Sequence, residues 1–172
     1  MKTKISGGLG RAEVLAFSLL EGSILTLGGV VAPVLFRRIP SRDQAGRIFG
    51  RILKNWFWLG LGCLLTLAVS GLNSLFQSKR PASTLLLGRL LVVFNMLGIL
   101  GFFRLVLAKM DTIRASLNGP IENYPPESGP RSEFNRLHRL STRLMQSVMG
   151  LGFAWLILSV IFSRKVRKHE LQ

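Results

Sequence analysis

The sequence predicts an all-α integral membrane protein: a four-helix bundle with an amphipathic interfacial helix after the first span. Three observations predict it. Hydrophobic residues make up 48% of the 172 residues, and they gather in four runs of about 20 residues, the length that crosses a bilayer as a helix. The 23 Lys and Arg residues outnumber the 8 Asp and Glu residues and lie mainly between these runs, where spanning helices meet anionic headgroups. The alternation typical of a membrane β-barrel is absent.

The expected spans are residues 13–36, 56–76, 84–108 and 144–162, within one membrane domain of residues 1–172. Helices are expected because a helix satisfies its own backbone hydrogen bonds in lipid. The basic start resembles a signal peptide, but no small-residue cleavage site with a polar segment follows, so the first span is expected to be retained. A nucleic-acid binder would gather its basic residues on a compact polar domain, and this distribution argues against that class.

The first connection, residues 37–55, contains another helix signal. Ser41 follows Pro40, and Gln44 stands three residues further on, which is a capping-box pattern. Hydrophobic residues then recur at helical spacing while basic residues take another face. This pattern is typical of a helix that lies at the interface or leads directly into the second span. Five basic residues are expected to contact lipid headgroups: Arg37, Arg38, Arg47, Arg51 and Lys54.

The later connections differ in character. The second, near residues 77–83, is short. The third, about residues 111–131, is rich in proline and glycine, so an irregular polar loop is expected there. Ser132 is the expected cap of a helix that continues into the fourth span.

Orientation follows from the distribution of basic residues. The connections after the first and third spans, residues 37–55 and 109–143, carry 12 Lys and Arg residues, and the terminal side carries 9. By the positive-inside rule, both termini are expected outside the cytoplasm. The expected location is the bacterial inner membrane.

Polar residues inside the spans predict an intramembrane cluster. Glu21 lies within the apolar stretch of residues 18–36, where an unpaired charge costs at least about 2.5 kcal/mol. At 1.5 Å per residue, four polar side chains lie about 12, 7, 6 and 16 Å below the terminal-side surface: Glu21, Arg89, Asn73 and Asn95. We expect Glu21 to face inward and to pair with Arg89, with Asn95 or Asn73 completing the hydrogen bonds.

This cluster has three interpretations. The ion pair joins the first and third spans, or it lines a cavity that binds a proton or another ligand. In the third interpretation Glu21 is protonated and donates a hydrogen bond to a backbone carbonyl.

His138, Met145 and Met149 form a candidate metal site near the start of the fourth span. Copper accepts His and Met ligands, with Cys63 as a further soft donor, although methionines at helical spacing are more typical of a packed core. A bis-histidine haem needs two histidines that face each other in the membrane, so His138 is left as a single candidate haem ligand. No resident cofactor is expected, with copper or haem as the alternative. No catalytic motif is present, and no enzyme is expected.

Two stretches match a known pattern. One is a span that ends in Ala-Pro-x-Leu-Phe and is followed by a proline and spaced glycines; the other is Phe-x-x-Leu-His-x-x-Ser. Together they resemble the transmembrane-protein-205-like family, through Ala32, Pro33, Leu35, Phe36, Pro40, Ala45, Gly46, Gly50, Phe134, Leu137, His138 and Ser141. The resemblance implies a four-span membrane protein of undefined biochemistry, with an animal relative linked to platinum-drug resistance. The sequence is also similar to copper-resistance membrane proteins of bacteria.

The expected function is that of a non-enzymatic accessory or scaffold protein, or a subunit of a larger membrane complex. One alternative is a transport or resistance protein for small molecules or copper that uses the intramembrane polar layer. Another is a haem-binding membrane subunit. The expected partners are anionic lipids and other membrane subunits, and no nucleic acid.

Overall fold

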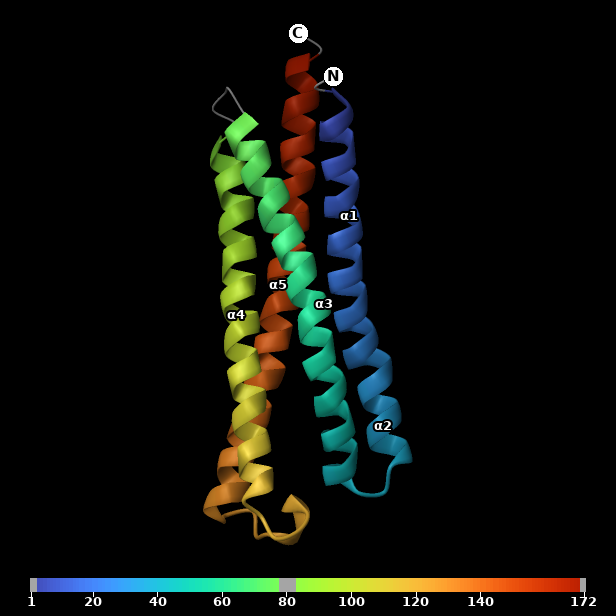
Figure 1. Ribbon diagram of the computed structural model, residues 1–172, viewed down its shortest axis with the longest axis vertical. Helices are drawn as coiled ribbons and strands as arrows, with labels where there is room; N and C mark the ends of the chain where they lie inside the picture. The colour runs from blue at the N-terminus through green and yellow to red at the C-terminus, as the bar shows by residue number, and fades with distance from the viewer. Residues whose placement is uncertain (1–2, 78–82, 171–172) are drawn as a thin grey trace.

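The computed structural model describes residues 3–77 and 83–170, with helical side chains described for residues 10–76 and 84–163. In this part of the chain there is no strand. Four helical segments are long and apolar enough to cross a membrane, which confirms the predicted all-α membrane bundle (Figure 1). The elements are α1 (Thr3–Thr26), a π-helical turn η1 (Leu27–Val31), α2 (Ala32–Arg38), α3 (Arg42–Gln77), α4 (Ser83–Ala115), a 3-10 turn η2 (Ile121–Asn123) and α5 (Gly129–Glu170).

The helices run antiparallel, so the bundle has two distinct ends (Figure 1). Both chain termini lie at one end, here called the terminal end. The loops before α3 and around η2 lie at the other, here called the loop end. α4 packs against α3 and α5, and α1 packs against α3. Three of the basic residues counted for the terminal end, Lys2, Lys79 and Arg80, lie outside the described residues, and the orientation stays a prediction.

The amphipathic segment and the third connection have different outcomes. The amphipathic segment is the first part of α3 and leads directly into the second span, which confirms the second of the two predicted arrangements. α4 continues to Ala115, which makes the irregular loop shorter than expected. α3 and α5 have 36 and 42 residues, or about 54 and 63 Å at 1.5 Å per residue. Because the hydrocarbon core is about 30 Å thick, the bundle extends beyond it.

The two predicted caps have different outcomes. The backbone N–H of Gln44 donates to Ser41 Oγ at 3.2 Å, which confirms the cap of α3. Ser132 is not the cap of α5, because this helix already begins at Gly129. Pro130 explains the early start: in the first turn of a helix its missing N–H costs no hydrogen bond.

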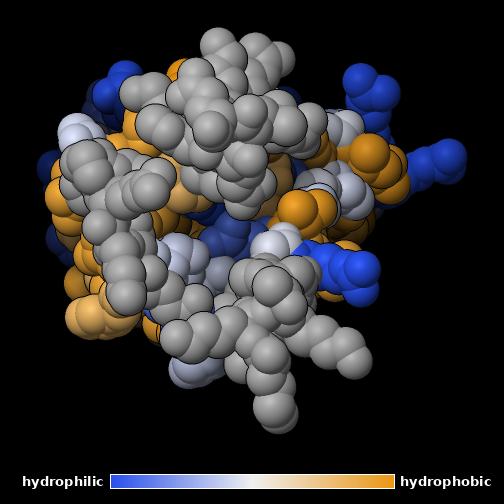
Figure 2. Space-filling model, turned by 90° about the horizontal axis from the view of Figure 1, so that it is seen from above, coloured by the Kyte–Doolittle hydropathy of each residue, from blue (hydrophilic) through white to orange (hydrophobic). Residues whose placement is uncertain are grey.

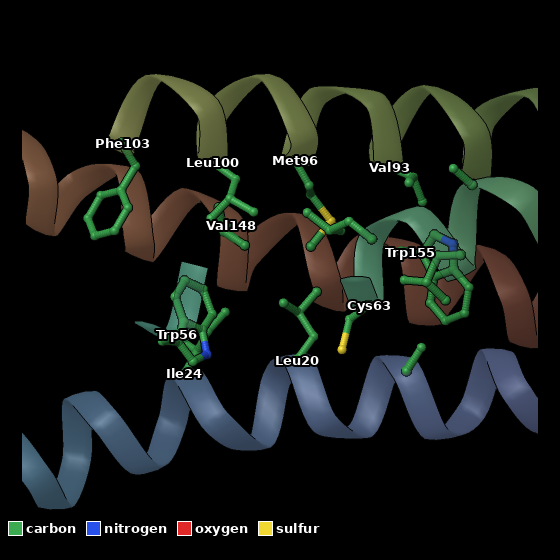
Figure 3. Packing of buried hydrophobic residues seen from close by; sticks show 14 of the residues in the cluster. Leu20, Ile24, Trp56, Cys63, Val93, Met96, Leu100, Phe103, Val148 and Trp155 are labelled. Atoms are coloured by element: carbon green, nitrogen blue, oxygen red, sulfur yellow. The ribbon is translucent and has the colours of Figure 1, made fainter. Parts of the chain in front are cut away.

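The core lies along the bundle axis (Figure 3). α4 contributes one buried face, with side chains that are each 1% exposed: Val93, Met96, Leu100 and Phe103. Leu20 and Ile24 of α1, Trp56 and Cys63 of α3, and Val148 and Trp155 of α5 complete it. Large hydrophobic side chains also cover the outside of the helices, and orange atoms are visible at the rim of the bundle in the end-on view of Figure 2. This exposed apolar surface is the part that faces lipid.

Candidate functional site at the loop end

Arg89 pairs with Glu13, and the predicted pair between Arg89 and Glu21 is wrong. Arg89 Nη2 lies 2.7 Å from Glu13 Oε2, and Ser70 Oγ donates to Glu13 Oε1 at 2.7 Å. Glu13 lies two helical turns, about 12 Å, closer to the terminal end than Glu21. A long arginine side chain extends toward the membrane surface to keep its charge near water, and this places the guanidinium beside Glu13.

An aromatic layer separates Arg89 from Glu21. The Arg89 guanidinium lies over the Trp155 ring, 4.9 Å from its centroid. The same ring stacks on Phe17, with centroids 5.0 Å apart. Phe17 stands on α1 midway between Glu13 and Glu21. α1 and α5 are therefore held together in the terminal half by packed rings.

Glu21 faces inward, as predicted, but without the predicted partner. Its side chain is 7% exposed, and neither carboxyl oxygen has a hydrogen-bond partner among the described residues. The carboxyl group lies against Gly152 of α5: a Cβ at that position would stand 2.5 Å from Glu21 Cδ. Gly152 thus provides the space that the carboxyl group fills.

The two asparagines lie apart from Glu21. Asn95 is exposed on the outer face of α4, and its Nδ2 donates to the Leu91 carbonyl of the same helix at 2.8 Å. The prediction that it joins the buried cluster is wrong, because this local bond satisfies the amide without another helix. Asn73 is half-buried on α3, one turn beyond Ser70.

A cleft of about 790 Å³ lies in the loop half and is here called the loop-end cleft. It lies between α1–η1–α2 and α5, with α3 and α4 as its floor. The wall from α1 to α2 is apolar and includes Leu25, Leu27 and Phe36. The loop-side opening is charged. The cleft therefore changes from apolar to charged along the bundle axis.

The π-helical turn that lines the cleft has a local cause in the sequence. Pro33 has no N–H, and its ring clashes with the carbonyl four residues earlier, that of Gly29. The backbone adopts a wider turn, in which Ala32 N–H bonds to the Leu27 carbonyl five residues back. Gly28 and Gly29 line the cleft, and a side chain at either position would meet open space. Such π-turns within α-helices frequently occur at functional sites.

A network of ion pairs holds the floor of the cleft. Asp43, 3% exposed, accepts from Arg114 Nε at 3.2 Å and pairs with Arg47 Nη2 at 2.7 Å. Lys54 pairs with Asp111. Both cross-helix pairs join α3 to α4, and they explain why α4 remains helical beyond its predicted end.

The two sequence motifs meet around Arg114. A Cβ at Gly46 would lie 2.6 Å from Arg114 Nη2, so the absent side chain makes room for the guanidinium. On the other side Arg114 lies over the Phe134 ring, 4.6 Å from its centroid. Residues of both motifs line the cleft, including Ala32, Phe36, Gly46, Gly50, Phe134, His138 and Ser141.

Glu122 lies at the loop-side opening of the cleft. Ser41 Oγ donates to Glu122 Oε1 at 2.6 Å. This bond, followed by bonds from the backbone amides of Asp43 and Arg42, lowers the pKa of the Glu122 carboxyl below its usual value of 4.5. An acidic side chain at the start of a helix is also favoured by the helix dipole. The turn η2 is thereby attached to the start of α3.

The candidate metal ligands share one wall of the cleft. His138, Met145 and Met149 all line it from α5, beside the polar side chains of Thr142 and Gln146. Cys63 belongs to the core cluster and not to the cleft lining, so it is no partner for them. The part of the chain that the structure describes holds no group of three or more His, Cys, Asp or Glu side chains that could bind a metal ion.

The predicted headgroup contacts divide into two groups. Arg37, Arg38 and Arg51 are exposed. Arg47 and Lys54 form the ion pairs with Asp43 and Asp111 described above. The charges of Arg47 and Lys54 are therefore partly neutralised by acidic residues of the protein itself.

Four charged or polar partners do not follow from the span pattern: Glu13, Ser70, Asp43 and Arg114. Glu13 stands at the boundary of the first predicted span, and Arg114 lies in the predicted third connection. Their position near the helix ends was the available signal, because charged residues at the same membrane level on neighbouring helices are candidates for pairing.

The comparisons with known proteins give a family and no function. Neither the curated proteins nor the solved structures contain a match to this chain. One family description matches residues 15–114, which run from α1 to the end of α4 and include Asp43 and Arg114. The wall that α5 contributes to the cleft lies outside the matched residues. Because this match covers more than half of the sequence, the chain belongs to the family described as Domain of unknown function (DUF4149).

Proposed function

We propose that this integral membrane protein binds an amphiphile with an anionic headgroup in the loop-end cleft and catalyses no reaction. The observation that carries the proposal is the cleft itself. Its volume of about 790 Å³ lies within the range of roughly 300–1,000 Å³ that is usual for small-molecule sites. Its apolar wall suits an acyl or similar chain, and its charged opening suits a polar headgroup.

The sign of the headgroup follows from the lining charges. Arg42, Lys54, Arg114 and Arg131 line the cleft together with three acids, Asp43, Asp111 and Glu122. Asp43 is shared by Arg114 and by Arg47, a further cation outside the lining. Cations are therefore in excess at the opening, which favours an anionic group.

A plug variant tests this proposal. Gly28→Phe places a ring in the open space of the cleft, whereas Gly62→Phe places one in open space on α3 outside it. The measurement is native mass spectrometry of protein purified from nanodiscs that contain phosphatidylglycerol and phosphatidylcholine. We expect the wild type and Gly62→Phe to retain phosphatidylglycerol and Gly28→Phe to lose it. Equal retention by the two variants would refute the cleft as the site, and equal retention of both lipids would refute the charge preference.

We propose an accessory role, in which the protein holds its ligand for other membrane proteins. The support is that the described residues form one helical bundle with only short connections between its helices. The proposed setting is the bacterial inner membrane with the loop end in the cytoplasm. A Ser128→Cys variant in a Cys63→Ala background should react with an impermeant thiol reagent only after the cells are opened. Reaction in intact cells would reverse the orientation.

A second candidate, copper handling, is favoured by the shared wall of His138, Met145 and Met149. It predicts that cuprous ion binds the purified protein at one equivalent and that His138→Ala removes the binding. The resemblance to the transmembrane-protein-205-like family also stays a prediction. Cuprous ion binding that is unchanged in His138→Ala would exclude this site.

A further inference from the structure

Glu21 is a buried acid that the proposed ligand site does not use. It is absent from the lining of the loop-end cleft, its side chain is 7% exposed, and its two oxygens have no hydrogen-bond partner among the described residues. A carboxylate in this position would lack both water and a counter-charge, which is costly in a membrane interior. The geometry therefore favours the neutral carboxylic acid.

No cation of the neighbouring helices neutralises Glu21. Among the described residues, the titratable side chains that point into this half of the bundle are Glu13 on α1, Cys63 on α3 and Arg89 on α4. Arg89 is committed to Glu13 at 2.7 Å, on the far side of the stacked rings of Phe17 and Trp155. α5 presents the bare backbone of Gly152 to the carboxyl group.

The carboxyl group lies one helical turn from the apolar end of the cleft. Ile24 and Leu25, three and four residues beyond Glu21 on α1, line the cleft. Met149, three residues before Gly152 on α5, lines it as well. One turn corresponds to about 5 Å along each helix. The same two helices that enclose Glu21 thus separate immediately below it.

We propose that Glu21 is a proton-binding site, which holds its proton as a carboxylic acid and exchanges it with water that enters through the loop-end cleft. On release, the O–H bond of the acid breaks, the proton passes to water in the cleft, and the carboxylate remains on Gly152. No oxidant or reductant takes part. The inference does not depend on the identity of the amphiphile, since it needs only the opening of the cleft.

Carbodiimide labelling tests the protonated state. In a hydrophobic carbodiimide the acid proton adds to one nitrogen and the carboxyl oxygen bonds to the central carbon, so the adduct has the summed mass of both reactants. We expect one adduct on the full-length protein in nanodiscs and its loss in Glu21→Gln, which retains the shape of the side chain. Glu127→Gln, in the exposed loop, should retain the adduct. An adduct that persists in Glu21→Gln, or its absence from the wild type, would overturn the proposal.

Infrared spectroscopy tests the exchange path. The carbonyl stretch of a protonated carboxylic acid should be present in the wild type, absent from Glu21→Gln and shifted after transfer into D₂O. Gly28→Phe should slow this shift, whereas the matched Gly62→Phe should not. A shift as fast in Gly28→Phe as in the wild type would refute access through the cleft. A carbonyl signal that never shifts in D₂O would refute exchange, whatever the lipid measurements give.

Discussion

The two halves of the bundle differ in the distance between α1 and α5, which are in contact in one half and separated in the other. In the terminal half, α1 and α5 touch: Phe17 stacks on Trp155, and the carboxyl group of Glu21 fits against Gly152. In the loop half, the same helices are separated by a cleft of about 790 Å³. Glycines occur at both places, so a small residue by itself does not decide whether two helices approach.

The side chains opposite each glycine account for the difference. Gly152 faces a carboxyl group that fills its space, whereas Gly28 and Gly29 face nothing within 4 Å. The π-turn beside Pro33 joins α1 to α2, and α2 lies away from α5 at the loop end (Figure 1). A packing motif in a membrane helix therefore acquires its role from the partner surface.

The largest expected effect is the loss of the ion pair that supports the closed half. Arg89→Met leaves Glu13 without its cationic partner, and breaking a buried ion pair in this way costs about 3–5 kcal/mol of unfolding free energy. Unfolding with increasing SDS in mixed micelles measures it.

Arg104→Met is the control, because Arg104 is half-buried on the same helix and forms no ion pair with the described residues. A smaller loss in Arg89→Met than in Arg104→Met would contradict the role assigned to the pair with Glu13.

The second effect concerns the contact between Glu21 and Gly152. Gly152→Ala would place a methyl group onto the carboxyl group, and overpacking of this kind costs about 1–3 kcal/mol. Gly150→Ala, with open space at its Cβ, should be neutral or slightly stabilising, since alanine favours a helix over glycine. Equal unfolding free energies for the two variants would show that α1 and α5 are not closed at this position.

A smaller effect is expected in the open half. Gly46→Ala brings a methyl group to 2.6 Å from Arg114 Nη2, so the guanidinium must move and its bond to Asp43 weakens. The expected cost is about 1 kcal/mol, because the end of the long Arg114 side chain borders the cleft and has room to adjust, whereas the Glu21 carboxyl group is buried against Gly152. Thermal unfolding in detergent compares it with Gly62→Ala, where the Cβ has no neighbour within 4 Å. A melting temperature unchanged from that control would contradict the account of Gly46.

The smallest effect is the pH dependence of the loop end. The folded pKa of Glu122 lies below its usual value of 4.5, so its contribution to stability is present above that value and is lost as the pH falls through the folded pKa. Hydrogen exchange of the first turn of α3 should therefore quicken on acidification, once corrected for the intrinsic rate.

Glu122→Gln should remove this pH dependence, and the exposed Glu127→Gln should preserve it. The same response to acid in Glu122→Gln and in the wild type would show that another group controls the first turn of α3.

The positions of the spans were predictable, whereas the polar pairing was not. The four spans lie within the observed helices because a run of apolar residues must become a helix in lipid. Ser41 was recognisable as a cap because its partner lies only three residues away. Glu21 was expected to face inward and does, but its expected partner Arg89 bonds to Glu13 instead. Depth estimates treat side chains as points, and a long arginine crosses more than one turn of its own helix.

Local features along the chain are enough to specify four membrane helices, a wider turn near Pro33 and the gathering of basic residues at the loop end. These follow from local chemistry: hydrophobicity over about 20 residues and a missing N–H. The packing of the four helices against one another is what places Glu21 against Gly152, makes room for Arg114 beside Gly46 and keeps the walls of the cleft apart. Those outcomes depend on the rotation of each helix about its axis and on the tilt of that axis. Both are determined by the packing of all four helices, and neither produces a periodic pattern in the sequence of a single helix.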